Sequence, residues 1–252
     1  MVKLEEKGIK RENLIIASGI GCHGKNFDYL NLSGFYSLHG RDMATIQGIK
    51  LANPDLKVVT FSGDGNCMGE GLAHTIFAAK RNADITILMH NNGVYALTTG
   101  QFTPLSEKGW QGPSTPKGSV EEPLNALSLM LEAGATFVAR AFPGKADHFV
   151  DIIVQAIEHE GFSFVEILQP AVAYRNTWHF YKENTIILSH EPNSYDEAMK
   201  IAKQRNKLPI GVLYRIKKPV FHKELYGDWN PVKKSISREN RLKKIKKILE
   251  PR

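Results

Sequence analysis

The sequence predicts an α/β fold with a mostly parallel central sheet and helices on both faces. Two apolar runs, at 58–61 and 85–89, are unbroken by polar residues, which is typical of parallel strands buried on both faces. The segment between them, 68–81, has a helix-like composition. A right-handed crossover of this kind ends both strands at the same edge of the sheet.

The other elements follow from the same patterns in chain order. The first half is expected to hold a short charged helix at 3–8, a buried strand at 14–17, a glycine-rich loop at 18–25, an irregular segment at 27–34 and a helix at 42–52. The second half is expected to hold a long loop at 102–120, helices at 123–133, 146–160 and 194–206, and strands at 136–140, 163–168 and 210–214. Ser194 is expected to cap the helix that follows it.

Length and charge divide the chain into one α/β domain over 1–215 and a basic tail over 216–252. The 252 residues, 42% of them hydrophobic, suffice for one sizeable core. Residues 215–252 carry 13 Lys and Arg against 4 Asp and Glu, a net charge of +9, whereas the whole chain carries +7. The basic character therefore belongs to the tail.

The tail ends in a basic segment with Leu242, Ile245 and Ile248 at helical spacing. It could dock on an acidic partner subunit, bind a negatively charged redox carrier or attract nucleic acid. We favour subunit docking or a simple gain in solubility, since no nucleic-acid-binding motif accompanies the charge. The aromatic segment 174–181 is expected to form an interface or a buried lid, or else to pack over the sheet edge of the same chain.

The sequence contains neither a signal-peptide-like apolar stretch near its start nor an apolar run of the roughly 18 residues that a membrane helix needs. We therefore expect a cytoplasmic protein that does not enter the membrane.

Polar residues follow both strands of the central unit. Gly63-Asp64-Gly65 comes after the first strand, and Asn92 comes after the second. Ligands of open α/β sheets lie outside the carboxyl ends of the strands, and glycines permit a close backbone approach. One carboxylate, one amide oxygen and a nearby backbone carbonyl suit Mg²⁺ bound to a diphosphate. Gly-Asp-Gly is also an ordinary turn, but the matching asparagine favours a site.

Five motifs occur together: GIGC at 19–22, LHGR at 38–41, GIKLANPDLKVVTFSGDG at 48–65, NN at 91–92 and YALTTGQ at 95–101. In this combination the chain resembles the β, or thiamine diphosphate-binding, subunit of the 2-oxoacid:ferredoxin oxidoreductases. The resemblance runs from about residue 15 to 181 and continues weakly to 208–215.

The resemblance implies a thiamine diphosphate-binding fold and the oxidative decarboxylation of a 2-oxoacid, such as 2-oxoglutarate or pyruvate, to its acyl-coenzyme A. The electrons would pass to ferredoxin or another acceptor. In this family a partner α (or α/γ) subunit supplies the glutamate that activates the cofactor, and no glutamate of this chain is obviously placed for that role. The resemblance therefore implies a heteromer of the α₂β₂ type.

The resemblance also assigns roles to single residues. It implies that Asp64, Asn92 and the carbonyl of Val94 bind Mg²⁺, and that His39 and Arg41 lie near the diphosphate or the reacting centre. The residues that it places at the cofactor are Gly21, Cys22, His39, Gly63, Asp64, Gly65, Asn66, Asn92, Leu97 and Thr98. The alternative for His39 and Arg41 is a turn cap and the start of a surface helix. Asn66 departs mildly from the aspartate that the family often has there.

Two of the family's substrate-facing positions correspond to Lys25 and Leu97. An ammonium group at position 25 would favour a dicarboxylic 2-oxoacid, because it could pair with the second carboxylate. The alternative, that Lys25 is a solvated loop lysine, has equal weight.

The usual 4Fe–4S cluster of the family needs four cysteine thiolates. Only Cys22 of GIGC matches; the N-terminal C-x-x-C is missing, and Ala171 stands at the later cysteine position. Cys67 replaces neither missing ligand and is expected to be a small buried hydrophobe. We therefore expect no cluster on this chain. Its electrons would then need another route, or the chain could belong to a non-oxidative decarboxylase or carboligase, or be a non-catalytic scaffold.

Overall fold

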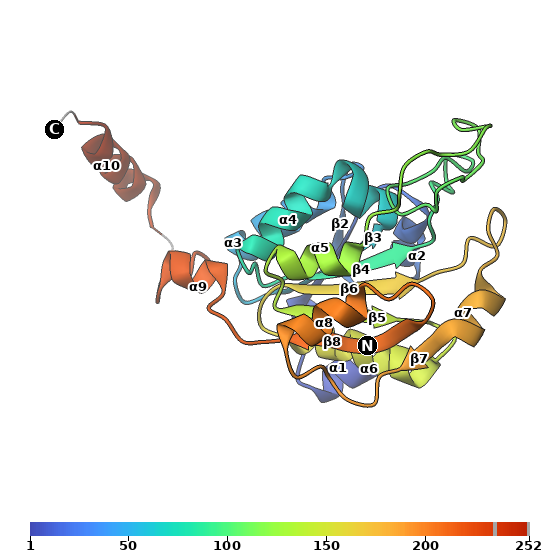
Figure 1. Cartoon of the computed structure of the whole chain (residues 1–252). Helices are drawn as coiled ribbons and strands as arrows, with labels where there is room; N and C mark the ends of the chain where they lie inside the picture. The colour runs from blue at the N-terminus through green and yellow to red at the C-terminus, as the bar shows by residue number, and fades with distance from the viewer. Residues whose placement is uncertain (234–235, 251–252) are drawn as a thin grey trace.

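The computed structural model describes residues 1–233 and 236–250, and its centre is an eight-stranded sheet (Figure 1). The strands lie in the order β2-β1-β3-β4-β6-β5-β8-β7. All neighbouring pairs are parallel except β5 and β8. The bounds are β1 Leu14–Ser18, β2 Ser33–Tyr36, β3 Lys57–Gly63, β4 Thr86–Asn91, β5 Phe137–Ala141, β6 Ser163–Leu168, β7 Thr185–Ile187 and β8 Leu208–Arg215. The expected α/β class is confirmed.

The helices are short and most of them pack on the sheet. They are α1 Val2–Glu6, α2 Asn26–Tyr29, α3 Asp42–Ala52, α4 Leu72–Lys80, α5 Ala126–Glu132, α6 Ala146–Glu158, α7 Trp178–Asn184, α8 Tyr195–Ala202, α9 Phe221–Tyr226 and α10 Arg238–Leu249. Single 3₁₀ turns lie at Arg11–Asn13 and Cys22–Lys25. Each described helix is too short or too polar to span a bilayer.

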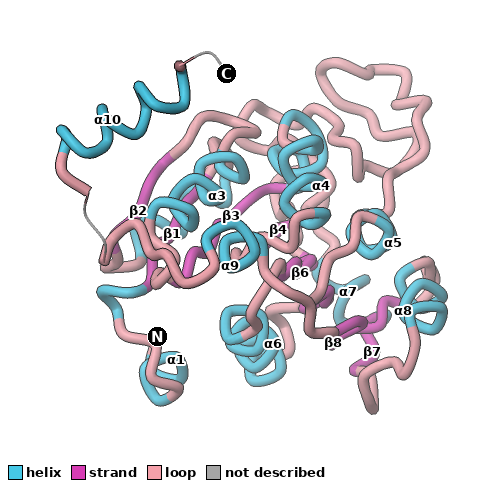
Figure 2. The backbone as a smooth tube through the Cα atoms, turned by 90° about the vertical axis from the view of Figure 1, so that its left-hand side faces the viewer, coloured by secondary structure: helices cyan, strands magenta, loops and turns pink. Residues whose placement is uncertain are grey.

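Two apolar layers cover the two faces of the sheet. Residues of α3, α4, α5 and α8 share one buried cluster, and residues of α1 and α6 share the other. Successive residues of a strand belong to different clusters: Val58 faces the first cluster and Val59 the second. Figure 2 shows the sheet between these helices. The unbroken apolar runs of the sequence are explained by burial on both faces.

The carboxyl ends of the central strands meet at one edge, as the crossover rule predicts. Ser18 at the end of β1 pairs with Phe61 of β3. Gly63 at the end of β3 pairs with His90 of β4. The loops after β1, β3 and β4 therefore begin side by side.

The first turn of the predicted helix at 68–81 differs from expectation. Asn66–Glu70 forms a π-helical turn, and the α-helix α4 begins only at Leu72. Such turns are frequent at functional sites because they redirect side chains. Here the turn carries Glu70 to the same edge of the sheet as Asp64.

Five elements were not predicted, namely α2, β2, α7, β7 and α9. Residues 27–34 were expected to be irregular, but they contain the end of α2 and the start of β2. All four residues of β2 are exposed, so no burial pattern marks the strand. The three-residue strand β7 and the helix α9 are too short for a readable period. The predicted cap is confirmed, since Ser194 Oγ accepts from the Glu197 amide at 3.2 Å.

The tail has two parts. Residues up to α9 pack on the body: Val220 is buried, and Tyr226 Oη donates to the Leu51 carbonyl at 3.0 Å. Helix α10 stands away from the body (Figure 1), and Leu242, Ile245 and Ile248 are exposed on it. The division at residue 215 stays a prediction. The contacts of α9 would support a boundary further along the chain.

Candidate functional site

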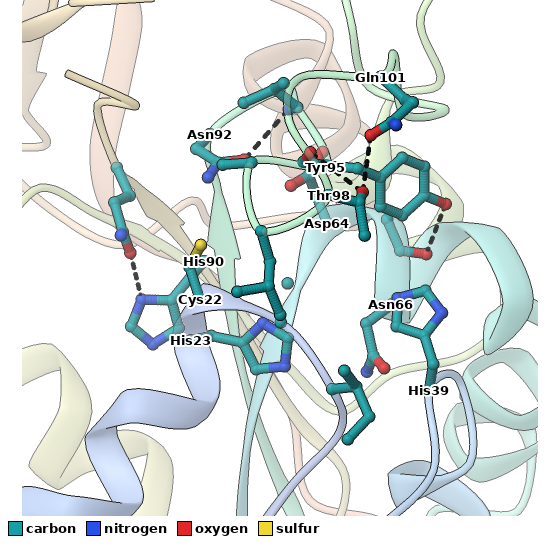
Figure 3. Close-up of a pocket in the computed structure, with 18 of the residues that line it drawn as sticks. Cys22, His23, His39, Asp64, Asn66, His90, Asn92, Tyr95, Thr98 and Gln101 are labelled. Carbon is teal, nitrogen blue, oxygen red and sulfur yellow. Dashed lines mark hydrogen bonds between the residues drawn. The ribbon is translucent and has the colours of Figure 1, made fainter. Parts of the chain in front are cut away.

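A cavity of about 480 Å³ opens at the carboxyl edge of the sheet (Figure 3). Its walls come from the loops after β1, β3 and β4, from the π-helical turn and from Gln169 just after β6. The predicted residues that line it are Gly21, Cys22, His39, Gly63, Asp64, Gly65, Asn66, Asn92, Val94, Leu97 and Thr98. One sheet edge thus gathers residues that are far apart in the sequence.

Asp64 is the most deeply buried acid of the cavity, with 2% of its surface exposed. Burial raises the pKa of its carboxyl to about 7, although Thr103 and the backbone amide of Asn92 favour the ionised form. Thr103 Oγ1 donates to Asp64 Oδ2 at 2.5 Å. None of the ion pairs in the described part of the chain involves Asp64. A buried carboxylate without a basic partner is what a bound cation would stabilise.

Asn92 and Val94 form a tight turn beside Asp64. The Val94 amide donates to Asn92 Oδ1 at 3.1 Å, and the Val94 carbonyl accepts from the Ala96 amide at 3.0 Å. Each of these two oxygens keeps a second lone pair. Together with Asp64 they form an all-oxygen donor set of the kind that Mg²⁺ prefers. The donors suit Mg²⁺ with water and phosphate ligands rather than a soft metal.

Residues 1–233 and 236–250 contain no group of three or more His, Cys, Asp and Glu side chains that could hold a metal. The predicted magnesium site has only one such residue, so it would not form a group of that kind.

Asn66 lines the cavity, but its side chain is fully used inside the protein. Nδ2 donates to Asp42 Oδ1 and to Ser62 Oγ, both at 2.7 Å, and Oδ1 accepts from the Gly40 amide at 2.7 Å. The side chain therefore braces the loop before α3 against the GDG turn. Contact between Asn66 and a diphosphate stays a prediction. Because the side chain is engaged within the protein, the backbone amide would have to make that contact.

His39 and Arg41 are separated by the structure. His39 lines the cavity, and its Nδ1 lies 3.2 Å from Glu70 Oε2. Tyr95 Oη donates to the same carboxylate oxygen at 3.1 Å. Arg41 is not among the cavity-lining residues, because its guanidinium donates to the carbonyls of Gly40 at 3.2 Å and Glu70 at 3.0 Å. The role of Arg41 at the reacting centre stays a prediction.

Of the two predicted substrate positions, one lines the cavity and the other does not. Leu97 is exposed and lines the cavity. The Lys25 side chain is 64% exposed and lies outside the cavity lining, where its ammonium group pairs with Asp28 at 2.6 Å. Thr98 donates to Gln101 Oε1 at 2.6 Å and so closes the turn that presents Leu97.

Two further histidines line the cavity, the buried His23 and the half-buried His90, and neither was singled out from the sequence. Burial, together with the nearby His90, lowers the pKa of His23 to about 3. A Cβ at Gly21 or Gly63 would lie within 2.8 Å of the His23 ring, so both glycines leave room for it. Burial also lowers the pKa of His90, whose Nδ1 lies 2.5 Å from Gln169 Oε1. Both imidazoles are therefore neutral near pH 7.

Sequence reasoning also missed Glu70, Tyr95, Gln101 and Gln169. Tyr95 and Gln101 lie inside the YALTTGQ motif, and Gln169 directly follows a predicted strand of the same sheet. Their places in the motif and directly after the strand could have identified these three residues as candidates. Glu70 depends on the π-helical turn, which the sequence did not indicate.

The two cysteines lie in different environments. Cys22 is exposed at the cavity, whereas Cys67 is buried and lies beside Thr75. Burial raises the pKa of the Cys67 thiol to about 12, so it is inert near neutral pH. Ala171 is buried after β6. The expectation for Cys67 as a small buried hydrophobe agrees with this placement.

Comparison with known families identifies two matches. Residues 19–167 match the family described as thiamine pyrophosphate enzyme, C-terminal TPP binding domain. Residues 173–227 match the family described as the C-terminal part of the pyruvate ferredoxin oxidoreductase beta subunit. The first match covers the strand ends that build the cavity.

Similar curated proteins are β subunits. The chain is 38% identical over 216 residues to the 2-oxoacid:ferredoxin oxidoreductase 1 subunit beta of Aeropyrum pernix, covering 79% of this chain and 68% of that one. It is 34% identical over 265 residues to the 2-oxoacid:ferredoxin oxidoreductase subunit beta of Sulfolobus sp, covering 95% and 87%.

A similar solved structure has the same fold. It is the 2-oxoglutarate:ferredoxin oxidoreductase from Magnetococcus marinus with 2-oxoglutarate, coenzyme A and succinyl-CoA bound. The TM-score is 0.88 at 32% sequence identity, and the match covers 98% of this chain and 86% of that one.

Proposed function

The chain belongs to the 2-oxoacid:ferredoxin oxidoreductase family as a β subunit, and we propose that it binds thiamine diphosphate and Mg²⁺ at the cavity described above. With an α subunit it would oxidatively decarboxylate a 2-oxoacid to the acyl-coenzyme A. The observation that carries this proposal is the buried carboxylate of Asp64, which forms no ion pair with a basic side chain of the described residues and lies beside the Asn92–Val94 turn.

The donor set supports the choice of cofactor. Asp64, Asn92 and the Val94 carbonyl would hold the metal, and Gly65 would let the backbone approach the diphosphate. When bound, thiamine diphosphate supplies the carbanion chemistry that breaks the bond between the oxo carbon and the carboxylate. The chain would hold and orient the anionic end, and its neutral histidines would present hydrogen-bonding groups without adding charge.

The His39–Glu70–Tyr95 group supports a role at the reacting centre. Glu70 Oε2 contacts both His39 Nδ1 and Tyr95 Oη, so the carboxylate would fix the orientation of the histidine ring. His39 would then present its ring to the cavity in a fixed orientation, where it could hydrogen-bond a bound group. We propose His39 as the catalytic residue of this chain, with Glu70 and Tyr95 positioning it.

The activation of the cofactor would need a second chain. The cavity is open, and exposed apolar side chains surround its rim, among them Ile20 and Leu97. We propose that this rim is covered by an α subunit, which supplies the activating glutamate, in an assembly of the α₂β₂ type. Coenzyme A and the 2-oxoacid would enter between the two subunits, and ferredoxin or another acceptor would dock on the assembly.

Substrate choice would depend on the two positions predicted to face the substrate. Lys25 pairs with Asp28 outside the cavity, so a dicarboxylic 2-oxoacid would have to draw its ammonium group away from that carboxylate. Leu97 faces the cavity directly and would contact the substrate side chain.

We propose that this chain holds no 4Fe–4S cluster, because Ala171 occupies one ligand position and Cys22 is the single matching cysteine. Electrons would then leave through a cluster on another subunit or through a different acceptor. Ala171 also favours a second candidate, a non-oxidative decarboxylase or carboligase. Metal analysis of the isolated chain tests the absence, and about four irons per chain would contradict it.

The function is tested with the purified α/β complex supplied with thiamine diphosphate and Mg²⁺. The oxidative proposal predicts that 2-oxoglutarate or pyruvate reduces a one-electron dye only when coenzyme A is present. Release of CO₂ without dye reduction would indicate the non-oxidative alternative. A complex that binds neither cofactor nor substrate would indicate the non-catalytic scaffold.

A further inference from the structure

A second cavity lies at the carboxyl edge of the sheet, beside the ends of β4, β5 and β6. It has a volume of about 270 Å³. His90 and Asn92 line the candidate cofactor cavity, whereas the intervening Asn91 and the following Gly93 line the second one. Alternation at the end of strand β4 explains why His90 and Asn91 line different cavities, because successive side chains of a strand point to opposite faces. The second cavity is therefore another space at the carboxyl edge of the sheet, where ligands of such sheets bind.

Its floor contains a buried ion pair. Arg140 of β5 and Glu166 of β6 face each other in the strand register, and Arg140 Nε donates to Glu166 Oε2 at 2.7 Å. The two side chains are 7% and 6% exposed. Asn91 Nδ2 donates to the other carboxylate oxygen at 2.7 Å. Both oxygens of Glu166 are thus hydrogen-bonded.

The guanidinium group is not satisfied to the same degree. Arg140 Nη1 is buried and has no hydrogen-bond partner within the described residues. A buried cationic N–H without an acceptor is costly, and such groups are rare in native proteins. Arg140 lines the cavity, and an acceptor bound within hydrogen-bond distance of this atom would satisfy it.

The lining carries an excess of positive charge. Arg175 and Arg205 join Arg140, against Glu107 and Glu166. Arg175 pairs with Glu107, whose side chain is 69% exposed, so solvent screens that pair. A Cβ at Gly93 would lie 3.5 Å from Arg175 Nη1, which places this guanidinium over the backbone of the cavity wall.

The remaining lining is largely apolar. It includes Leu105, Leu124, Leu168, Phe180 and Tyr181. A ligand that matches both parts has an apolar body and one anionic group.

We propose that this second cavity binds a small carboxylic acid with an apolar body. Its carboxylate accepts a hydrogen bond from Arg140 Nη1 and lies in the field of Arg175, and its body packs on Leu168 and Tyr181. Binding here is separate from the cofactor cavity and does not depend on the function proposed above.

The test uses benzoate as the probe, with benzamide as the neutral control of the same shape. Each is titrated by calorimetry into the purified α/β complex at constant ionic strength. We expect saturable benzoate binding and no detectable benzamide binding over the same concentrations. Saturating thiamine diphosphate and Mg²⁺ should leave the benzoate sites available, because the two cavities are distinct.

Variants locate the site. Arg140→Gln combined with Glu166→Gln keeps a hydrogen-bonded neutral pair and should weaken benzoate binding about tenfold or more, as expected for a lost charge-assisted bond. Arg175→Gln changes a partly exposed residue and leaves the buried Arg140–Glu166 ion pair intact. This variant should weaken benzoate binding about threefold or more. Arg215→Gln removes an arginine that pairs with Glu191 outside the cavity and should not change it.

Four results would overturn the proposal. These are no saturable benzoate binding, equal binding of benzamide, displacement of benzoate by thiamine diphosphate, and unchanged affinity in both the double variant and Arg175→Gln. If the double variant does not fold, the comparison of benzoate affinity between Arg175→Gln and Arg215→Gln decides whether the proposal holds.

Discussion

The carboxyl of Asp64 sets the chemistry of the site at the scale of single residues. The protein buries this group at the end of β3 with Thr103 as its side-chain hydrogen-bond donor. The ionised form would be stable there only with a cation nearby, so the apoprotein holds the group with a pKa of about 7. A metal site that is built in advance costs stability until the metal binds.

The pH dependence of the apoprotein follows from this residue. The folded-state pKa of Asp64, about 7, lies above its ordinary value of 3.8, so folding takes up a proton between these two pH values. The free energy of unfolding should therefore fall as pH rises from about 4 to about 7. Asp64→Asn should remove this loss and stabilise the apoprotein at pH 8 by on the order of a few kcal/mol.

Urea unfolding of the two proteins at pH 5 and pH 8 measures this difference. Asp151→Asn, at an exposed residue of α6, serves as the control. Equal stabilisation of Asp64→Asn at both pH values would contradict the role given to Asp64.

A second residue-scale prediction concerns Asn66 and Asp42. The Asp42 carboxyl is fully buried; its pKa is raised by burial, and hydrogen bonds from Asn66 and Thr60 oppose that rise. Asn66→Asp would place two carboxyl groups together and should destabilise the protein by about 3 kcal/mol at pH 7. Asp42→Asn in the same chain should recover much of this loss, because one carboxylate and one amide then face each other again.

A double-mutant cycle by thermal or urea unfolding gives the coupling between positions 42 and 66. Additive losses would show that the two side chains do not interact as described. The pairing gives the Asn66 amide a physical role, since it donates to the buried Asp42 carboxylate.

At the scale of elements, a buried ion pair ties α3 to the residues before β4. Lys50 Nζ lies 2.6 Å from Asp84 Oδ2, and the two side chains are 5% and 9% exposed. The amide of Gly161 donates to the other Asp84 oxygen at 3.0 Å. The pair thus joins α3, the entry to β4 and the turn before β6.

Lys50→Ala should therefore lower the free energy of unfolding by about 3 to 5 kcal/mol, because Asp84 stays buried without its main partner. The exposed pair Lys3–Asp151 is the matched control, and Lys3→Ala should cost less than about 1 kcal/mol. Although burial favours the neutral acid, Lys50 and Lys57 lower the pKa of Asp84. The pair therefore contributes stability above the ordinary Asp pKa and loses it on acidification. Equal losses for both lysine variants in urea unfolding would contradict this account.

At the scale of the whole molecule, the buried part of the fold was readable from the sequence and the edges were not. Apolar runs such as 58–61 and 85–89 became β3 and β4 because burial on both faces leaves a clear pattern. The edge strand β2 is exposed throughout, and β7 has three residues, so neither carries such a pattern.

The candidate site divides in the same way. Asp64 and Asn92 were predictable because polar residues directly follow matching strands. His23, His90 and Glu70 reach the cavity through a 3₁₀ turn, a strand end and a π-helical turn, whose local geometry the sequence does not specify. Arg41 and Lys25 matched motif positions, yet backbone carbonyls and Asp28 hold them outside the cavity.

The central claim is that the end of β3 and the turn after β4 hold a metal–diphosphate group. The most direct measurement is calorimetric titration of thiamine diphosphate into the α/β complex with and without Mg²⁺. We predict binding that requires Mg²⁺, that is abolished by Asp64→Ala and that is unchanged by Asp151→Ala. Binding of equal strength in Asp64→Ala, or no binding to the unmodified complex, would contradict the claim.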